Sequence, residues 1–171
     1  ALVVTSLANA GPSSSVGTGA EGGAHPWIGL GRSGTTNTTL KYIGTGHSTS
    51  RRIHLWGATA NLTCTIDASG TGPLVLRGEI TRPPSESFDK VLMLKGTNTG
   101  TNTISGQIAD SISGAKTLVA KEGVGKWVLR GPNAYTGDTA VNGGTLLVNG
   151  FGSLAASSAV TVGANATLGG N

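Results

Sequence analysis

The eight acidic side chains are the residues that could do chemistry in this sequence, because a pair of carboxylates can act as general acid and base. Two carboxyl groups that flank a glycosidic bond would hydrolyse a polysaccharide. No two acids lie within two positions of each other, and the nearest grouping is Glu86 with Asp89. Distant acids could still meet in the fold, and Asp67 with Glu79 or Asp89 is the pair to inspect. The spacing predicts no catalytic residue, so a polysaccharide-active enzyme is the least favoured function.

Histidine and cysteine are the other candidate ligands or nucleophiles. His25 and His47 fall in expected loops, and His54 alternates with apolar neighbours and is expected to face solvent. The one cysteine, Cys64, lies in the alternating run LTCTID and is predicted to point into the core as a small apolar residue. An intermolecular disulfide is the less favoured alternative. Because no zinc-type spacing or phosphate loop is present, the sequence predicts neither a metal nor a cofactor.

Four aromatic residues could form a surface on which sugar rings stack: Trp27, Tyr42, Trp56 and Tyr135. Surface glycans are therefore one candidate partner. The alternative is that these side chains pack in the core or between stacked strands, which is the favoured interpretation. The two readings differ in whether the rings reach solvent.

Composition excludes several classes of function. The 171 residues carry a net charge of +4, only 12% of them are charged, and 29 are glycine. Basic residues are scattered, with only Arg51 and Arg52 adjacent, and no aromatic residues interleave with them, so nucleic-acid binding is not expected and the basic side chains are expected to be solvated. No apolar run is long enough to cross a bilayer, so no membrane insertion is expected.

The stretch from Leu118 to Leu147 indicates the fold that must position all of these residues. Short apolar runs with small or polar residues between them are broken by glycines every few residues. Glycine permits the positive φ angles of tight corners, and no run is long enough for a helix with an apolar stripe. Strands this short with corners this close predict a solenoid, an all-β coil of stacked rungs.

This stretch resembles the passenger-associated transport repeat of bacterial autotransporters, also called the autotransporter-associated β-strand repeat. The residues that fit its pattern are Leu118, Lys121, Gly123, Gly125, Trp127, Leu129, Gly131, Asn133, Tyr135, Thr136, Gly137, Thr139, Val141, Gly144, Thr145 and Leu146. The similarity continues through SSAVTVGANATLGG, so residues 118–171 are the closest match. The resemblance implies a right-handed parallel β-helix on a secreted, surface-displayed protein, without catalytic residues.

The rest of the chain is expected to extend the same coil as a single domain over residues 1–171. Pro83 and Pro84 cannot continue a strand ladder, so residues 81–89 are predicted to leave the coil. A repeat of about twenty residues per rung would give roughly seven to nine rungs.

The two ends of such a coil suggest the function, because an uncovered strand edge is a template for another strand. The sequence shows no charged helix, proline block or polar cap at either end. We therefore expect an extracellular structural protein of the bacterial surface that assembles head to tail with copies of itself into fibres. The alternative is a segment of an autotransporter passenger or adhesin stalk that joins the remainder of a longer passenger. The expected assembly residues are Leu2, Val4, Val160, Val162 and Leu168.

Overall fold

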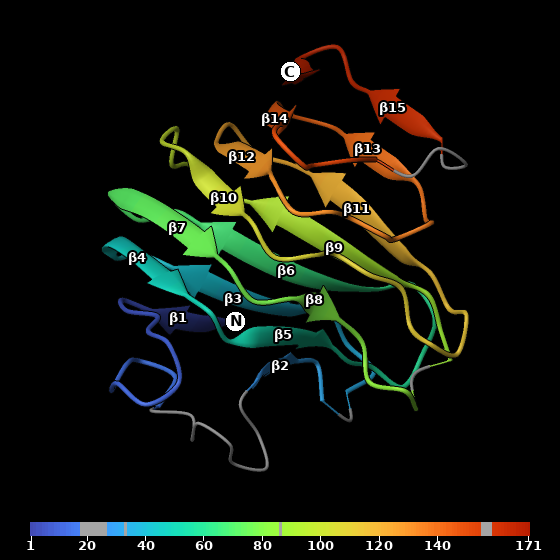
Figure 1. Cartoon of the computed structure of the whole chain (residues 1–171), viewed down its shortest axis with the longest axis horizontal. Coiled ribbons are helices and arrows are strands. Elements are labelled where there is room, and N and C mark those ends of the chain that lie inside the picture. The colour runs from blue at the N-terminus through green and yellow to red at the C-terminus, as the bar shows by residue number, and fades with distance from the viewer. Residues whose placement is uncertain (18–26, 33, 86, 155–158) are drawn as a thin grey trace.

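The protein is a stack of parallel β-strands wound into a coil (Figure 1). A computed structural model describes residues 1–17, 27–32, 34–85, 87–154 and 159–171, which contain sixteen strands. None of the described segments is a helix that could span a membrane. The predicted all-β parallel coil is confirmed. Crossovers between parallel strands are right-handed as a rule, which is the hand expected of this coil.

The first sheet runs the length of the coil and has seven strands in the order β1-β3-β6-β9-β11-β13-β15. No two neighbouring strands in this sheet are consecutive in the chain, because the chain passes through the other sides of the coil before it returns. These strands are β1 (Leu2–Val4), β3 (Thr38–Tyr42), β6 (Leu62–Ala68), β9 (Lys90–Lys95), β11 (Thr117–Lys121), β13 (Thr139–Val141) and β15 (Val160–Val162).

Two further sheets close the coil. The second has six strands: β4 (Thr45–Thr49), β7 (Gly72–Leu76), β10 (Asn102–Ile104), β12 (Lys126–Leu129), β14 (Gly144–Val148) and β16 (Ala166–Gly170). The third has three: β2 (Trp27–Leu30), β5 (Arg52–Leu55) and β8 (Ile80–Thr81). Isolated bridges from Ile80 to Ile108 and from Ala109 to Ala134 extend this third side toward the C-terminus.

Coil length changes along the chain. In the first sheet, successive register partners are 26, 28, 27, 20 and 21 positions apart, along the series Leu40, Ile66, Leu94, Lys121, Val141 and Val162. The coil makes about five turns and its first sheet stacks seven strands, so the estimate of seven to nine rungs holds only at its lower end. The reason is that the coils before β11 take more residues than the twenty assumed.

Side chains that point inward from the three sheets form one core. Along the first sheet, Leu40, Ile66 and Leu94 stack above one another and are fully buried. Ile53 and Ile80 do the same in the third sheet. This stacking of like side chains follows from the parallel register, because each residue lies over its partner in the coil below. Cys64 joins this core at 1% exposure, which confirms the prediction that its thiol points inward.

Residues 5–17 fold across part of the N-terminal end, which the sequence did not predict. Leu7 is fully buried and Val16 packs against the core. The Thr49 hydroxyl donates a hydrogen bond to the Ala8 carbonyl at 2.7 Å, beside strand β4. The guanidinium of Arg51 donates to the Val16 carbonyl at 3.2 Å, from one of its two terminal nitrogens. The end of β4, at Thr49, is therefore held against this segment of the same chain.

Residues 81–89 were predicted to leave the coil, but Thr81 is still paired in β8, and residues 82–89 lie between β8 and β9 and carry no strand in their described part. The segment is tied down by Arg82, whose side chain is 3% exposed. Its guanidinium donates to the carbonyl oxygens of Phe88 and Ala115. A buried arginine thus holds this segment against the loop of the next coil.

Glycines in the repeat-like stretch serve close approach more than unusual backbone angles. Gly123 and Gly144 have positive φ angles of 68° and 64°. At Gly131 and Gly137, by contrast, an added Cβ would lie 2.1 Å from the carbonyl oxygen of Gly106 and 2.4 Å from that of Thr117. Successive coils therefore touch at positions where only glycine fits.

Candidate functional site

The described carboxylates make structural contacts and do not form an acid–base pair. Asp67 accepts a hydrogen bond from the Ser69 hydroxyl, and Glu79 lies 3.7 Å from the Arg52 guanidinium on the third side of the coil. Asp89 accepts from the backbone N–H of Lys116 at 2.6 Å. The proposed pair, Asp67 with Glu79 or Asp89, is thus not brought together.

Further carboxylates tie coils to one another. One oxygen of Asp110 accepts from the N–H of Thr117, and the other accepts from the N–H and hydroxyl of Thr136. Asp138 accepts from the N–H of Ala159, 21 positions later. Glu86 and Glu21 lie outside the described residues. Because Asp67, Asp89, Asp110 and Asp138 accept hydrogen bonds within the coil, these acids act as structural acceptors.

The two described histidines, His47 and His54, do not lie around a common centre. His47 Nδ1 lies 2.8 Å from the hydroxyl of Tyr42, and His54 belongs to another sheet. His25 lies outside the described residues. Among the described side chains, no three or more of the His, Cys, Asp and Glu type are grouped so that they could hold a metal ion.

His54 was expected to face solvent, and the structure shows it half-buried. Its ring stacks on Trp27 with centroids 4.8 Å apart and an interplanar angle of 17°. Burial lowers the pKa of His54, the neighbouring Arg52 lowers it further, and Glu79 opposes both. The alternation of residue types correctly put the side chain on the outer face, but it could not show that two tryptophans cover that face.

The four aromatic candidates separate into core and surface. Tyr42 and Tyr135 are fully buried, so they cannot form a face on which sugars stack. The Tyr135 hydroxyl lies 2.8 Å from the Thr139 hydroxyl, which satisfies its polar end inside the coil. Trp27 and Trp56 remain half-buried at the surface of the third sheet.

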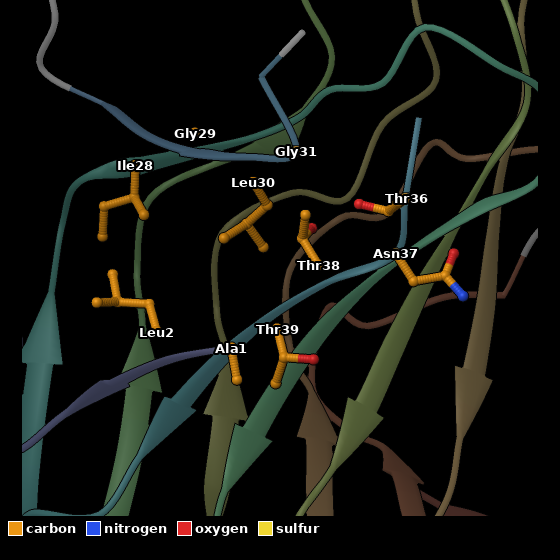
Figure 2. Close-up of a pocket in the computed structure, with 10 residues that line it drawn as sticks. All are labelled: Ala1, Leu2, Ile28, Gly29, Leu30, Gly31, Thr36, Asn37, Thr38 and Thr39. Atoms are coloured by element: carbon orange, nitrogen blue, oxygen red, sulfur yellow. The ribbon is translucent and has the colours of Figure 1, made fainter. Parts of the chain in front are cut away.

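The N-terminal end of the coil is partly open. Leu2 pairs with Leu40 and so belongs to an inward-facing row, yet it is 54% exposed. A hollow of about 370 Å³ lies between the start of β1, strand β2 and the start of β3. Leu2 and Ile28 point toward each other across it, and Leu30 lies beside them (Figure 2). Val4, by contrast, is 2% exposed and packs within its own chain.

The C-terminal end exposes the same kind of inward-facing row. Val160 and Val162 pair with Thr139 and Val141, which are buried, but they are themselves 42% and 49% exposed. Leu168 continues the buried row of Leu146 and is partly buried against the core. Among the described strands, β15 and β16 each pair on one side, so both present a free edge.

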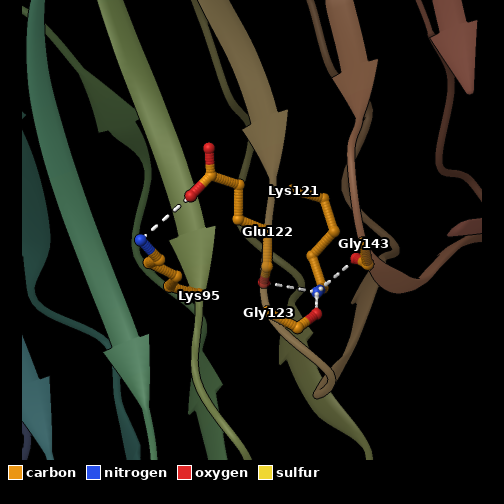
Figure 3. A network of polar contacts seen from close by, with 5 residues as sticks. All are labelled: Lys95, Lys121, Glu122, Gly123 and Gly143. Carbon is orange, nitrogen blue, oxygen red and sulfur yellow. Dashed lines mark hydrogen bonds and ion pairs between the residues drawn. The ribbon is translucent and has the colours of Figure 1, made fainter. Parts of the chain in front are cut away.

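A buried lysine closes the corner between β11 and β12 (Figure 3). Lys121 is fully buried, and its ammonium donates to the carbonyl oxygens of Glu122, Gly123 and Gly143 at 2.7, 2.8 and 2.9 Å. These three acceptors satisfy all three donors of an ammonium group. Beside it, Lys95 and Glu122 form an ion pair at 2.9 Å.

Buried basic residues were missed by the sequence reasoning, which expected them to be solvated. The structure buries four of them, with at most 7% of the residue exposed: Arg51, Arg82, Lys90 and Lys121. The missed signal is the alternation of side chains along a strand. Lys121 follows Val119 by two positions in β11, so its side chain must point to the same side as that valine.

The corner glycines, the buried Trp127 and Tyr135, and the buried Lys121 all lie in the stretch from β11 to β14. The sequence pattern of the passenger-associated-transport-repeat family matches residues 119–148. The chain carries a passenger-associated transport repeat. The resemblance inferred from the sequence is thereby confirmed. The matched residues run from the middle of β11 to the end of β14, or about one and a half turns of the coil.

One relative extends the comparison beyond the transport repeat. The chain is 38% identical over 153 residues, or 88% of its length, to the Adhesin BmaC autotransporter of Brucella suis biovar 1 (strain 1330). It spans about 4% of the length of that relative. No solved structure matches the chain. The relative therefore supports the autotransporter context for the coils before the repeat as well.

Proposed function

We propose that this chain is a structural, non-enzymatic stretch of an autotransporter passenger, displayed outside the bacterial cell as part of an adhesin. The transport repeat and the similarity to an adhesin autotransporter support this function. The carboxylates described above are used as structural acceptors, which favours a structural role over catalysis. The coil would extend the passenger and hold adhesive surfaces away from the cell.

Inward-facing side chains are exposed at both ends of the coil, and this exposure supports a proposal about how the ends pair. Leu2, Val160 and Val162 occupy rows that are buried elsewhere in the coil. Such rows become buried when another parallel rung stacks on them, by strand addition to a free edge. We propose that the end rungs pair with further rungs, and that copies of the chain stack head to tail through Leu2, Val160, Val162 and Leu168. Val4 contributes to the core beneath this contact.

Surface display is tested by placing the chain within a passenger ahead of its translocator and labelling intact cells with antibody to residues of the coil. Labelling of intact cells is the expected result. Labelling that requires permeabilised cells would contradict the extracellular location.

Head-to-tail stacking is tested separately by sedimentation and electron microscopy of the purified chain at rising concentration. Unbranched filaments are expected, and a Leu2→Lys/Val162→Lys double variant should stay monomeric because lysine would be buried at the contact. Val124→Lys is the matched control, since Val124 is 69% exposed in the corner between β11 and β12. If the chain stays monomeric at all concentrations, head-to-tail assembly of copies is refuted. The end rungs would then pair only with other rungs of one longer passenger.

A further inference from the structure

Two of the three tryptophans lie on the outer face of the third sheet. Trp27 lies in β2, and Trp56 directly follows β5. The third, Trp127, is fully buried, and its indole N–H donates to the Lys95 carbonyl at 2.9 Å. Aromatic residues are rare in this chain, at 4%, so their gathering on one outer face is a feature to be explained.

Four planar groups form what we call the aromatic row: Trp27, His54, Trp56 and Arg32. The His54 ring lies between the tryptophans, 4.8 Å from the centroid of Trp27 and 6.2 Å from that of Trp56. The Arg32 guanidinium lies 5.8 Å from the centroid of Trp56. The three rings are half-buried and Arg32 is exposed, so the row lies at the surface and is held by packing.

The backbone beneath the row makes room for it. Gly29 pairs with His54 in the sheet, and a Cβ at Gly29 would lie 3.3 Å from the indole nitrogen of Trp56. That distance is tighter than ordinary contact, so a side chain at this position would press on the indole. The indole therefore rests against β2 where the strand has no side chain, which fixes its position before any ligand arrives.

The charges beside the row favour an anion. Arg52 and Glu79 flank His54 and face each other at 3.7 Å, so their charges offset one another. Among the described residues, the Arg32 guanidinium lies over the Trp56 ring and forms no ion pair with a carboxylate. A guanidinium binds a carboxylate with two parallel hydrogen bonds, so Arg32 can receive one from a ligand.

We propose that the aromatic row binds a pyranoside that carries a carboxylate, such as a uronic or sialic acid in a surface polysaccharide. The C–H groups on the apolar face of a sugar ring would lie against the indole of Trp56, since aromatic faces carry partial negative charge. The carboxylate would pair with Arg32, and Arg52 and Glu79 would bond hydroxyl groups at the edge. This site is independent of how the ends of the coil pair.

The test is titration of the intact ¹⁵N-labelled chain with oligogalacturonate and with sialyllactose, following the indole N–H signals. A shift of the Trp56 signal is expected with at least one of these probes, and the responding probe distinguishes a uronic from a sialic acid. Trp56→Leu and Arg32→Gln should each weaken binding by about tenfold or more, as expected for contacts at the centre of a binding surface. Because the Arg32 side chain is exposed, the Arg32→Gln substitution should not disturb folding.

Matched controls separate this site from general attraction to a basic protein. Phe151→Ala removes an aromatic side chain that is 87% exposed, and Arg130→Gln removes an exposed arginine elsewhere. Neither should change the affinity. The proposal is overturned if neither acidic sugar binds, or if polyglutamate shifts the Trp56 signal as much as the acidic sugars do. It is also overturned if a neutral maltooligosaccharide binds as tightly as the acidic sugars, or if the control variants weaken binding as much as Arg32→Gln does.

Discussion

The ammonium of Lys121 donates to the carbonyl oxygen of Gly143, 22 positions later in the chain, at 2.9 Å. Its two other hydrogen bonds, to Glu122 and Gly123, stay within its own coil. One side chain therefore joins the corner of one coil to the corner of the next. Gly144 adjoins this corner with a φ of 64°, and a Cβ there would lie 2.9 Å from the lysine nitrogen. Lysine and glycine thus form one corner unit of the transport repeat.

Replacing this lysine should loosen the repeat. Lys121→Met keeps the length of the side chain but leaves three carbonyl oxygens without their donor. We expect a loss of about 2 kcal/mol in the free energy of unfolding at pH 7, because buried acceptors without partners are costly. Urea unfolding followed by circular dichroism measures it. Lys116→Met, at an exposed position, should cost under about 0.5 kcal/mol; equal losses in both variants would refute the role of the corner.

The same lysine predicts a pH dependence. Burial lowers the pKa of Lys121 to about 8, and the carboxylate of Glu122 opposes part of that shift. The unfolded chain, with a lysine pKa near 10.4, binds more protons than the folded chain between these two values, so this group makes stability rise with pH there. Wild type should therefore gain stability relative to Lys121→Met from pH 8 to about 10.5. If the difference in unfolding free energy between wild type and Lys121→Met stays constant across this range, the lowered pKa of Lys121 is contradicted.

Much of the coil was predictable because its signals are local. The alternating apolar residues and frequent glycines around Trp127 indicate short strands, and the repeat pattern adds their order. The N-terminal closure was not predictable, since residues 8–17 hold one large apolar residue, Val16, and no periodicity. Its position depends on Arg51, which reaches it from 35 positions away. Contacts of that separation leave no pattern in one sequence.

The candidate surfaces were only partly predictable for the same reason. The exposure of Leu2, Val160 and Val162 could be expected because the ends of a stacked coil expose what its middle buries, whereas their role in assembly stays a prediction. Val4 was grouped with them because alternation alone does not show what covers an end. Likewise, aromatic residue type could not separate Tyr42 from Trp56, since only the register decides which ring faces the core.

The stacked His54 predicts a second pH dependence of the same sign, a loss of stability in acid. Its pKa is lowered by burial first and by Arg52 second, so the unfolded chain takes up a proton before the folded chain as the pH falls below about 6.5. Stability contributed by the neutral ring is present above that pH and is lost as the pH falls through the folded pKa. Wild type should lose more stability between pH 7.5 and pH 5 than His54→Gln, as measured by urea unfolding midpoints. Parallel losses in the two proteins would contradict this.

Close approach of coils predicts that some glycines tolerate no side chain. Gly72 in β7 lies so near β4 that an added Cβ would be 1.9 Å from the carbonyl oxygen of Thr45. Because that neighbour is backbone, the strands must separate, and Gly72→Ala should cost about 1–3 kcal/mol. Gly163→Ala is the matched control, since its nearest neighbours are at an ordinary 3.5 Å, and it should stay within about 0.5 kcal/mol of wild type. Thermal unfolding of both variants provides the comparison, and a neutral Gly72→Ala would show that the two strands can separate without loss.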